Sequence, residues 1–468
     1  MMKKYMGIFG LFFMICCGCT STHAADDAAQ KYQDKALEMI RVSVSMRTAK
    51  GFGNVPELAT YIADEFKSAG FDQKDIHLLP MGDTAALVIR YRGDGSSGKK
   101  PILLSAHMDV VDALPKDWER DPFTLIEENG YYYGRGVNDN KFGIAVLAAT
   151  MMRLKSEGFV PNRDIILALT GDEETRMITT RSLVTEYRHL IDAEFALIPD
   201  GGGGHLDENG KAVSFSVDSA EKTYATFEMT ARNSGGHSSR PKRDNAIADL
   251  SAALNKVFRY EFPVRTNELT LSYFEQTAPL VGGTVGDAMK RFAENPQDKD
   301  AVSILRSIPV YVGSLGTTCV PTMLRAGHAE NALPQSATAT INCRVFPGLG
   351  VDETLARLKK IVANDAIEWK GLGSPLESDA SPVRKDVFEA ISRGVHASYP
   401  DLPIIPHMAS GASDALHFRA VGIPSYTFSG IFIKDSDKFS HGLNERIPTD
   451  TLPVAMKMWR SILMELAS

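Results

Sequence analysis

The sequence predicts an α/β fold: a mostly parallel sheet with helices on both faces, into which a smaller α+β module is inserted. From about residue 101, short continuously apolar runs alternate with longer helical patterns. Near residue 219 the pattern changes to alternating strands and amphipathic helices, and from about residue 375 the first pattern returns. Continuously apolar runs are typical of strands that helices cover on both sides. A chain of 468 residues is long enough for two or more domains.

Three apolar runs predict neighbouring strands of the larger part. They read PILLSA (101–106), DIILALT (164–170) and AEFALIP (193–199). Between the first two, residues 141–158 (KFGIAVLAATMMRLKSEG) predict a helix of about four turns that ends at Gly158 and is followed by Pro161.

The inserted module is predicted over residues 219–374. YATFEMTAR and ATATINCRVF alternate as half-buried strands do, whereas NAIADLSAALNKVF and VDETLARLKKIVA are helical in pattern. A further stretch at about 280–310 has helical segments with polar breaks and is interpreted as an extra segment inside the module. Residues 25–218 and 375–468 then form the two parts of the larger domain.

The N-terminal residues 1–24 have the layout of a secretory signal peptide, with two lysines, an apolar run and small residues. The apolar run is shorter than the roughly 20 residues that a bilayer requires. Two endings stay open: cleavage after Ala24, or lipid attachment at Cys19, which would leave a lipid anchor as the one link to a membrane. Either ending predicts a secreted or periplasmic protein. Of the other cysteines, Cys319 and Cys343 are expected to be buried free thiols, with one bridge between them as the alternative in an oxidising compartment.

The net charge of −7 and the pI near 5.9 exclude nucleic acid as a partner, because no basic block interleaved with aromatic residues occurs. Small polar substrates are the expected partners.

Acidic residues and a histidine follow the predicted strands directly. The carboxyl ends of parallel strands meet at one edge of a sheet, so these side chains should converge. They are His107 and Asp109 after the first run, Glu173 and Glu174 after the second, Asp200 after the third, and Asp139 just before the helix. Each alone has an ordinary explanation, such as a polar turn or a helix cap. Together they would repel one another strongly unless a cation neutralised them.

Imidazole and carboxylate ligands suit zinc, and so many acids indicate two ions that share one carboxylate. A second histidine is then expected, and His441 in KFSHGLNERIP is the best candidate.

Six motifs in order, SAHMDVV, GRGVNDNK, TGDEE, IPDGG, GGHSSRP and FSHGLNE, resemble the dinuclear-zinc peptidase family that includes glutamate carboxypeptidase, acetylornithine deacetylase, carnosinase and aminoacylase. Within it, HMDVV, DWERDPF and GYYYGRGVNDNK resemble the carboxypeptidase S and secreted N-acyl amino acid hydrolase branch. The resemblance implies that the inserted module is a ferredoxin-like lid, through which some relatives dimerise.

The resemblance also implies a role for each residue of the cluster. His107 and Asp200 would hold one metal, His441 and Glu174 the other, and Asp139 would bridge both. Glu173 would be the general base, and Asp109 would bind the far nitrogen of His107 and fix its tautomer. The cofactor would be two zinc ions, with cobalt or manganese as substitutes.

Four further residues match family positions that contact substrate. His237 would stabilise the oxyanion, reaching the partner's active site in dimeric relatives. Asn331 and Arg344 would hold the free carboxylate of the substrate, with a rim salt bridge as an equally weighted role for Arg344, and Gly411 would belong to a backbone-binding loop. For His237 and Gly411, the alternative to a role in substrate binding is an ordinary turn.

The predicted function is the cleavage of an amide bond next to a C-terminal carboxylate in short peptides, by water that zinc activates and Glu173 deprotonates. Removal of the acyl group from an N-acyl amino acid is the alternative. A noncatalytic metal- or peptide-binding protein and a two-metal phosphoesterase are the rivals from other classes. After GDEE relatives often have glycines where this chain has TRMITTR, and Phe142 replaces a frequent glycine, so substrate specificity stays open.

Overall fold

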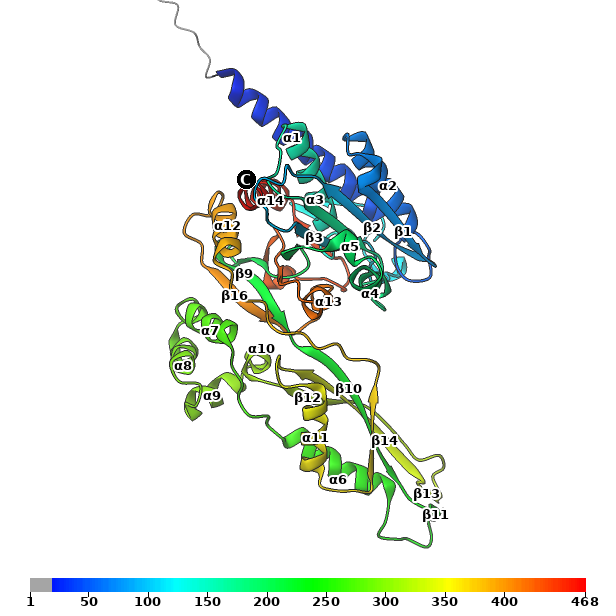
Figure 1. Cartoon of the computed structure of the whole chain (residues 1–468). Coiled ribbons are helices and arrows are strands. Elements are labelled where there is room, and N and C mark those ends of the chain that lie inside the picture. The colour runs from blue at the N-terminus through cyan, green and yellow to red at the C-terminus, as the bar shows by residue number, and fades with distance from the viewer. Residues whose placement is uncertain (1–18) are drawn as a thin grey trace, which may run out of the picture.

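A ten-stranded sheet and a separate four-stranded sheet divide the chain into two parts (Figure 1). The computed structural model describes residues 19–468. The predicted signal peptide therefore lies outside the described residues, apart from the start of helix α1 (Cys19–Ser45). Within the described range, no helix is both long enough and apolar enough to pass through a bilayer.

The large sheet is mixed: its central strands pair in parallel, the β1 side is antiparallel, and the β9 side has both antiparallel pairs (β17–β9 and β8–β9) and parallel pairs (β16–β9 and β18–β8). Strand β3 pairs in parallel with β6 and β7, and β7 with β17, whereas β1, β2 and β6 pair antiparallel. The α/β prediction is confirmed, with antiparallel pairs beyond the parallel centre. In sheet order the strands are β1 (Ile76–Met81), β2 (Thr84–Tyr91), β6 (Ile165–Thr170), β3 (Ile102–His107), β7 (Phe195–Ile198), β17 (Ser425–Thr427), β9 (Ala212–Glu221), β8 (Gly203–Leu206) and β18 (Phe432–Lys434), with β16 (Ile404–Ala409) beside β9.

Helices cover both faces of this sheet because alternate strand residues face opposite sides. In β3, Ile102 and Leu104 belong to one buried cluster, and Leu103 belongs to another. The first cluster includes residues of α1, α2 (Val55–Ser68), α3 (Lys141–Ser156), α12 (Lys385–His396) and α14 (Thr451–Leu466). The second includes residues of α4 (Ile178–Thr185), α5 (Arg188–Ile191) and α13 (Ala415–Ala420).

A small sheet of β4 (Ile126–Glu128), β5 (Tyr131–Tyr133) and β19 (Arg446–Pro448) joins the loops that precede α3 and α14. It ties the segment before Asp139 to the segment after His441.

The second part, which we call the lid module, has an antiparallel sheet with helices α6 (Ala246–Arg259) and α11 (Val351–Val362) packed on it. Its strands are β12 (Thr318–Ala326), β14 (Ser336–Val345), β10 (Thr223–Arg232) and β15 (Ile367–Leu372), with a short hairpin-like pair β11 (Gly236–His237) and β13 (Ala332–Leu333) at the end farthest from the large sheet (Figure 1). Only Lys222 separates β9 from β10. The bounds 219–374 for this module stay a prediction.

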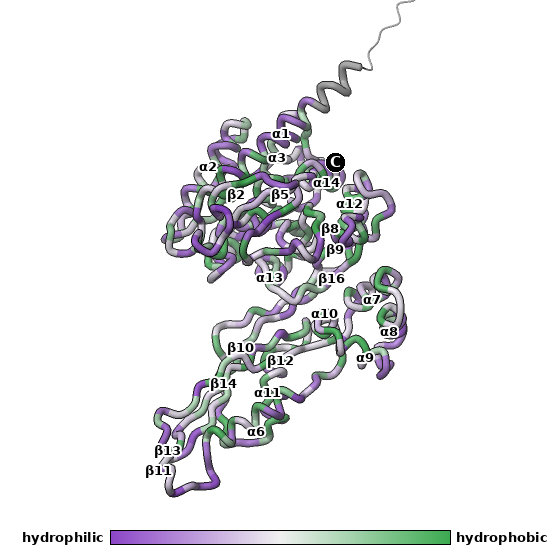
Figure 2. The backbone as a smooth tube through the Cα atoms, turned by 180° about the vertical axis from the view of Figure 1, so that it is seen from behind, coloured by the Kyte–Doolittle hydropathy of each residue, from purple (hydrophilic) through white to green (hydrophobic). Residues whose placement is uncertain are grey.

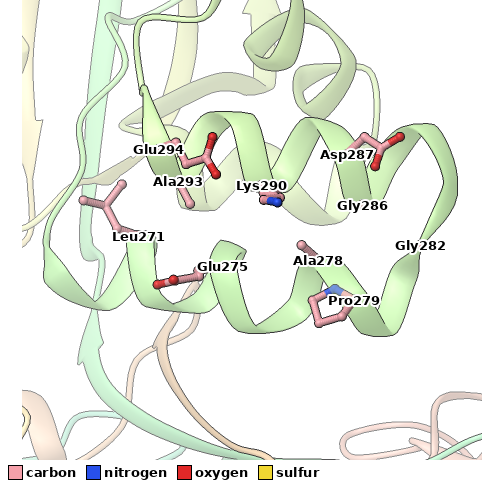
Figure 3. Close-up of a pocket in the computed structure, with 10 residues that line it drawn as sticks. All are labelled: Leu271, Glu275, Ala278, Pro279, Gly282, Gly286, Asp287, Lys290, Ala293 and Glu294. Atoms are coloured by element: carbon pink, nitrogen blue, oxygen red, sulfur yellow. The ribbon is translucent and has the colours of Figure 1, made fainter.

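Four helices, α7 (Glu268–Val281), α8 (Gly283–Glu294), α9 (Lys299–Arg306) and α10 (Pro309–Val312), form a helical insertion inside the module. Phe274, Met289, Phe292 and Leu305 make a buried cluster of their own there. Figure 3 shows the groove between α7 and α8, where Leu271 and Ala278 lie among charged residues that include Glu275 and Lys290. The insertion is therefore a packed unit, and its helix α7 contacts β16 of the large sheet.

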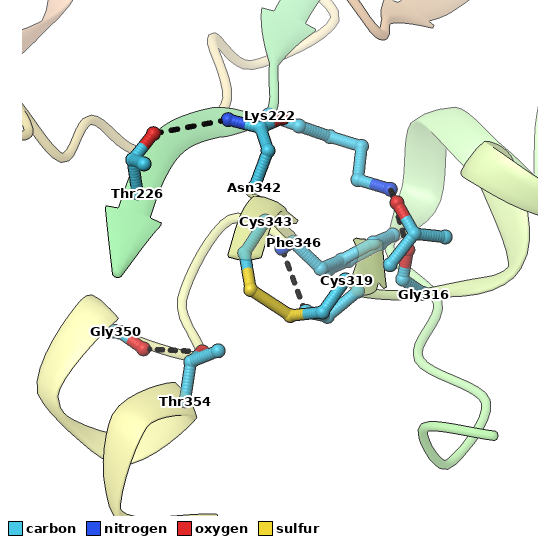
Figure 4. Close-up of a disulfide and its surroundings, with 11 residues drawn as sticks. Lys222, Thr226, Gly316, Cys319, Asn342, Cys343, Phe346, Gly350 and Thr354 are labelled. Atoms are coloured by element: carbon cyan, nitrogen blue, oxygen red, sulfur yellow. Dashed lines mark hydrogen bonds between the residues drawn. A yellow bond between two sulfur atoms is a disulfide. The ribbon is translucent and has the colours of Figure 1, made fainter. Parts of the chain in front are cut away.

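A disulfide joins Cys319 to Cys343 (Figure 4), so the prediction of two free thiols is wrong. The two residues lie directly opposite each other in the antiparallel pair of β12 and β14. The 24 residues that separate them in sequence concealed this register.

Candidate metal centre

Three predicted residues meet at the carboxyl edge of the large sheet. His107 ends β3, beside Thr170 at the end of β6, and Asp200 follows β7. His107 Nε2 lies 2.8 Å from Asp139 Oδ1 and 3.6 Å from Asp200 Oδ1. The histidine is fully buried, at 1% exposure, although it faces two carboxylates.

The second half of the site is built around His441. Its Nε2 lies 2.9 Å from Glu174 Oε1 and 3.2 Å from Asp139 Oδ2. Asp139 thus turns one oxygen toward each histidine. The ligand atoms of His107, Asp139 and Glu174 all lie within 4.8 Å of one another. This is the arrangement that a carboxylate bridging two ions requires.

Asp109 holds the two glutamates in place. Its carboxylate accepts hydrogen bonds from the backbone N–H of Glu173 at 3.0 Å and of Glu174 at 3.1 Å. His107 Nδ1 lies 3.0 Å from the backbone oxygen of Asp109 and 3.5 Å from its carboxylate. With Nδ1–H donating to that carbonyl, Nε2 offers its lone pair to the centre of the site. The tautomer is therefore fixed chiefly by the backbone of Asp109, and its side chain positions Glu173 and Glu174.

Glu445 supports the loop that carries Asp139, and the sequence reasoning assigned it no role. Its buried carboxylate accepts from the backbone N–H of Asn138 at 2.8 Å and of Asp139 at 3.1 Å, and pairs with Arg135 Nη1 at 2.6 Å. Burial raises the pKa of Glu445, while Arg135 and the backbone N–H groups oppose the rise. Glu445 stands four residues after His441 in the motif FSHGLNE, and this position was the sequence feature from which its role could have been predicted.

The residues fit a pair of cations. Among residues 19–468, no Lys or Arg side chain forms an ion pair with Asp139, Glu173, Glu174 or Asp200, although the four acids share one site. Two imidazole nitrogens and several carboxylate oxygens form a donor set typical of zinc. The chain supplies no positive group of its own except protonated histidine.

The pKa values reflect this missing positive charge. Burial alone would lower the pKa of His107, but Asp200, Asp109 and Asp139 raise it well above its usual value. Hydrogen bonds with Asp139 and Glu174 raise the pKa of His441 to about 10. Protons on the histidines therefore take the place of a metal in the metal-free site.

Glu173 is different from the ligand acids because it contacts no cationic partner. Burial, together with the charges of Asp200, Asp414 and Glu174, raises its pKa to about 10, although His107 opposes the rise. The carboxyl group of Glu173 lies beside the candidate ligands but forms no hydrogen bond with them. Such a group is suited to accept and release a proton.

Asp414 is a second residue that the sequence reasoning missed. Its buried carboxylate accepts from the hydroxyls of Thr170 and Thr180. It thereby connects the loop of Gly411 to the end of β6 and to α4. Burial raises the pKa of Asp414 to about 7.

The predicted substrate residues fall into two groups. Arg344 Nη1 donates to the backbone oxygen of Ser410 at 3.2 Å, so Arg344 and the loop of Gly411 lie together where the lid module meets the large sheet. His237 and Asn331 lie instead at the far tip of the lid module, where Ser238 N–H donates to Asn331 O at 3.1 Å. Both are exposed, in a segment that is largely hydrophilic (Figure 2). The structure thus brings together five metal-ligand candidates, and Arg344 with Gly411, but leaves His237 and Asn331 apart from the metal centre of their own chain.

Comparison with known proteins agrees with this geometry. Residues 103–465 match peptidase family M20/M25/M40. The chain belongs to this family. The family predicted from the six motifs is therefore confirmed, and the chain is an enzyme of the metallopeptidase and hydrolase type.

Two curated relatives support the predicted branch. The N-fatty-acyl-amino acid synthase/hydrolase of Xenopus tropicalis is 28% identical over 371 residues, which cover 78% of this chain and 72% of the relative. A probable carboxypeptidase S-like protein of Dictyostelium discoideum is 26% identical over 373 residues, covering 77% of this chain and 70% of the relative.

Solved structures share the fold. A family M20 metallo-carboxypeptidase from Sulfolobus solfataricus has a TM-score of 0.69 and 19% identity, covering 92% of this chain and 98% of that one. A dinuclear metal-binding peptidase from Bacillus subtilis has a TM-score of 0.60 and 12% identity, covering 94% and 98%.

Proposed function

We propose that this chain is a secreted two-zinc hydrolase that cleaves the amide bond next to a C-terminal free carboxylate in short peptides. One observation carries the proposal: Asp139 faces His107 with one oxygen and His441 with the other, while Glu173 stands beside this arrangement without a cationic partner. His107, Asp200 and Asp139 would hold one ion, and His441, Glu174 and Asp139 the other. The bound zinc pair would supply Lewis acidity and lower the pKa of water toward about 7.

The residues of the chain would perform the proton transfers. Glu173 takes a proton from the attacking water and delivers it to the departing amine. Asp109 fixes the positions of Glu173 and Glu174 because its carboxylate accepts hydrogen bonds from their backbone N–H groups. Arg344, beside the Gly411 loop, would pair with the substrate's carboxylate, because the guanidinium fork matches a carboxylate in geometry.

The test is a mass-spectrometric assay of the zinc-loaded protein on a pool of free dipeptides and N-acyl amino acids. The wild type should consume one class of substrate, and Glu173→Gln should consume none while retaining both metals. Retained activity in Glu173→Gln would show that Glu173 is not the general base. Two bound metals without turnover of any substrate would favour a noncatalytic binding protein.

Hydrolysis of N-acyl amino acids is the second candidate, and the name of the Xenopus relative favours it. The bond cleaved and the carboxylate recognised would be the same, and only the acyl side would differ. The same pool decides between them, since the class that disappears identifies the acyl group.

A homodimer through the lid module would bring His237 to a metal centre. Its exposed position supports this proposal, since β11, which carries His237, lies at the end of the lid module farthest from the large sheet (Figure 1). In such a dimer, His237 of one copy would donate to the oxyanion in the other.

A further inference from the structure

The metal ligand Asp200 is followed directly by four glycines, 201–204. Glycine has the greatest backbone freedom of any residue, so this sequence cannot by itself fix the position of a ligand. Gly201 and Gly202 have φ angles of 140° and 50°. An added Cβ on Gly202 would lie 2.6 Å from the backbone oxygen of Ser216 on β9. The run therefore passes tightly against β9, and its neighbours must hold it in place.

Asp218 on β9 is one of those neighbours. Its Oδ2 accepts a hydrogen bond from the backbone N–H of Gly202 at 3.0 Å, two residues after Asp200. Among residues 19–468, it is the one charged side chain that hydrogen bonds the backbone of residues 201–204. Asp218 is 7% exposed, so water competes little for this bond.

The other oxygen of Asp218 binds a histidine on the neighbouring strand. His407 on β16 lies opposite Asp218 in the parallel register, and its Nδ1–H donates to Asp218 Oδ1 at 2.6 Å. The His407 ring in turn packs against Tyr273 of α7, with ring centroids 5.0 Å apart. Contacts therefore run from the helical insertion through Tyr273, His407 and Asp218 to the backbone beside Asp200.

We propose that Asp218 and His407 are positioning residues for the metal ligand Asp200, and that Tyr273 makes the helical insertion part of this support. The proposal rests on the proposed two-metal function. It gives the insertion a role in the metal centre of its own chain, separate from any role at a dimer surface. Mutation of a residue that holds a metal ligand in place without touching the metal typically lowers metal affinity 10- to 100-fold.

The experiment measures metal content by elemental mass spectrometry after dialysis against a weak chelator, and affinity by competition with a zinc indicator. The wild type should retain two zinc ions per chain. Asp218→Ala should retain about one, with the weaker ion bound roughly 10- to 100-fold less tightly. His407→Ala and Tyr273→Leu should show progressively smaller losses.

Asp218→Asn is the decisive partner variant. Its amide oxygen can still accept from Gly202 N–H, and its NH₂ can donate to a neutral His407 ring, so it should recover most of the lost affinity. Recovery of metal content in Asp218→Asn would show that the hydrogen bonds of Asp218, rather than its charge, support the ligand. Asp207→Ala is the matched control, because Asp207 holds the exposed turn between β8 and β9 through the N–H groups of Asn209 and Lys211. Tyr311→Leu controls for Tyr273, since Tyr311 packs on Phe274 in the same insertion.

Each outcome has one meaning. Two ions in the wild type and in Asp218→Ala, bound equally tightly, would overturn the positioning role and leave the proposed function intact. Fewer than two ions in the wild type would overturn the proposed function itself. Equal losses in Asp218→Ala and Asp207→Ala would assign the effect to general destabilisation and also overturn the positioning role.

Discussion

The metal centre and the tip of the lid module differ in how their residues are held. His107, Asp139 and Glu174 come from different segments, and their neighbours Asp109 and Glu445 fix the backbone around them. At the tip, the ring of His237 bonds Ser239, two residues away, and no other of the residues 19–468. Among residues 19–468, the candidate metal ligands meet within one chain, whereas no such cluster lies beside the exposed polar groups of the tip.

This difference shows where each kind of residue can act. Side chains at the end of parallel strands converge because the sheet brings them together, so their chemistry needs only one copy of the chain. Side chains at the tip need a second surface, which a second copy of the chain can supply. Variants in the two regions should therefore behave differently when two damaged proteins are mixed.

The largest effect is expected from Asp139, which faces both histidines. Asp139→Ala should lose both metal ions and all measurable activity, because each ion loses a ligand and only one acid remains beside each histidine, Asp200 beside His107 and Glu174 beside His441. His441→Ala should lose one ion only. Metal content per chain, measured beside activity, checks this order. One retained ion in Asp139→Ala would show that the carboxylate is not shared.

The second prediction concerns the tip. His237→Ala should lower kcat by about 10²- to 10³-fold, as the loss of an oxyanion donor does. When His237→Ala is mixed with Glu173→Gln and the subunits exchange, about a quarter of wild-type activity should return, since half of the dimers would be hybrids with one intact site.

The control for this mixing is Glu173→Gln with Asp139→Ala. Both sites of each hybrid receive an intact His237 from the partner, but one site lacks Glu173 and the other lacks Asp139. No activity should return. If activity returned in neither mixture, His237 would act within its own chain or have no catalytic role.

The convergence of the candidate ligands could be predicted from the sequence because these polar residues stand next to strands whose apolar character is unambiguous. His107 follows Leu103 and Leu104, and Asp200 follows Leu197 and Ile198, so one element of secondary structure fixes each ligand. Glu445 and Asp414 were missed because their roles depend on backbone N–H groups and threonine hydroxyls from distant segments. Such contacts leave no local pattern.

The disulfide and the glycine run show the same limit. Cys319 and Cys343 pair because β12 and β14 are in a particular register, and a shift of one residue would have turned the thiols to opposite faces. The bond from Gly202 to Asp218 likewise depends on β9 passing beside the loop of Asp200. Register and strand order belong to the folded chain and were not accessible from residue spacing.

A smaller effect is expected at Arg344, where the two regions meet. Arg344→Lys should raise KM about tenfold with a smaller change in kcat, because a lysine keeps the charge but loses the two-pronged contact with a carboxylate. Arg325→Lys is the control, since Arg325 pairs with Glu228 on the exposed surface of the lid sheet. An unchanged KM would show that Arg344 does not bind the substrate's carboxylate. Its role would then be structural, through its hydrogen bond to Ser410 and its contact with Tyr224.

The smallest effect is a dependence of stability on pH in the metal-free protein. The pKa of His441 rises from about 6.5 to about 10 on folding, and that of Glu173 from about 4.5 to about 10. A pKa raised by folding stabilises the protein fully below the unfolded value and loses this contribution as pH rises toward the folded value. The melting temperature of the metal-free protein should therefore fall from about pH 4.5, where Glu173 contributes, and more steeply between about pH 6.5 and about pH 10, where His441 contributes as well.

Zinc should weaken this dependence, because a metal takes the place of the proton on His441. The stabilisation by zinc, measured as the difference in melting temperature with and without the metal, should accordingly grow over the same pH range. His441→Ala should make the metal-free profile less steep above about pH 6.5 and leave the part due to Glu173, whereas His328→Ala, at an exposed histidine of the lid module, should leave the profile unchanged. A wild-type profile that is equally flat with and without zinc would mean that His441 carries no proton in the metal-free site, and the close approach of its ring to Asp139 and Glu174 would then need another cause.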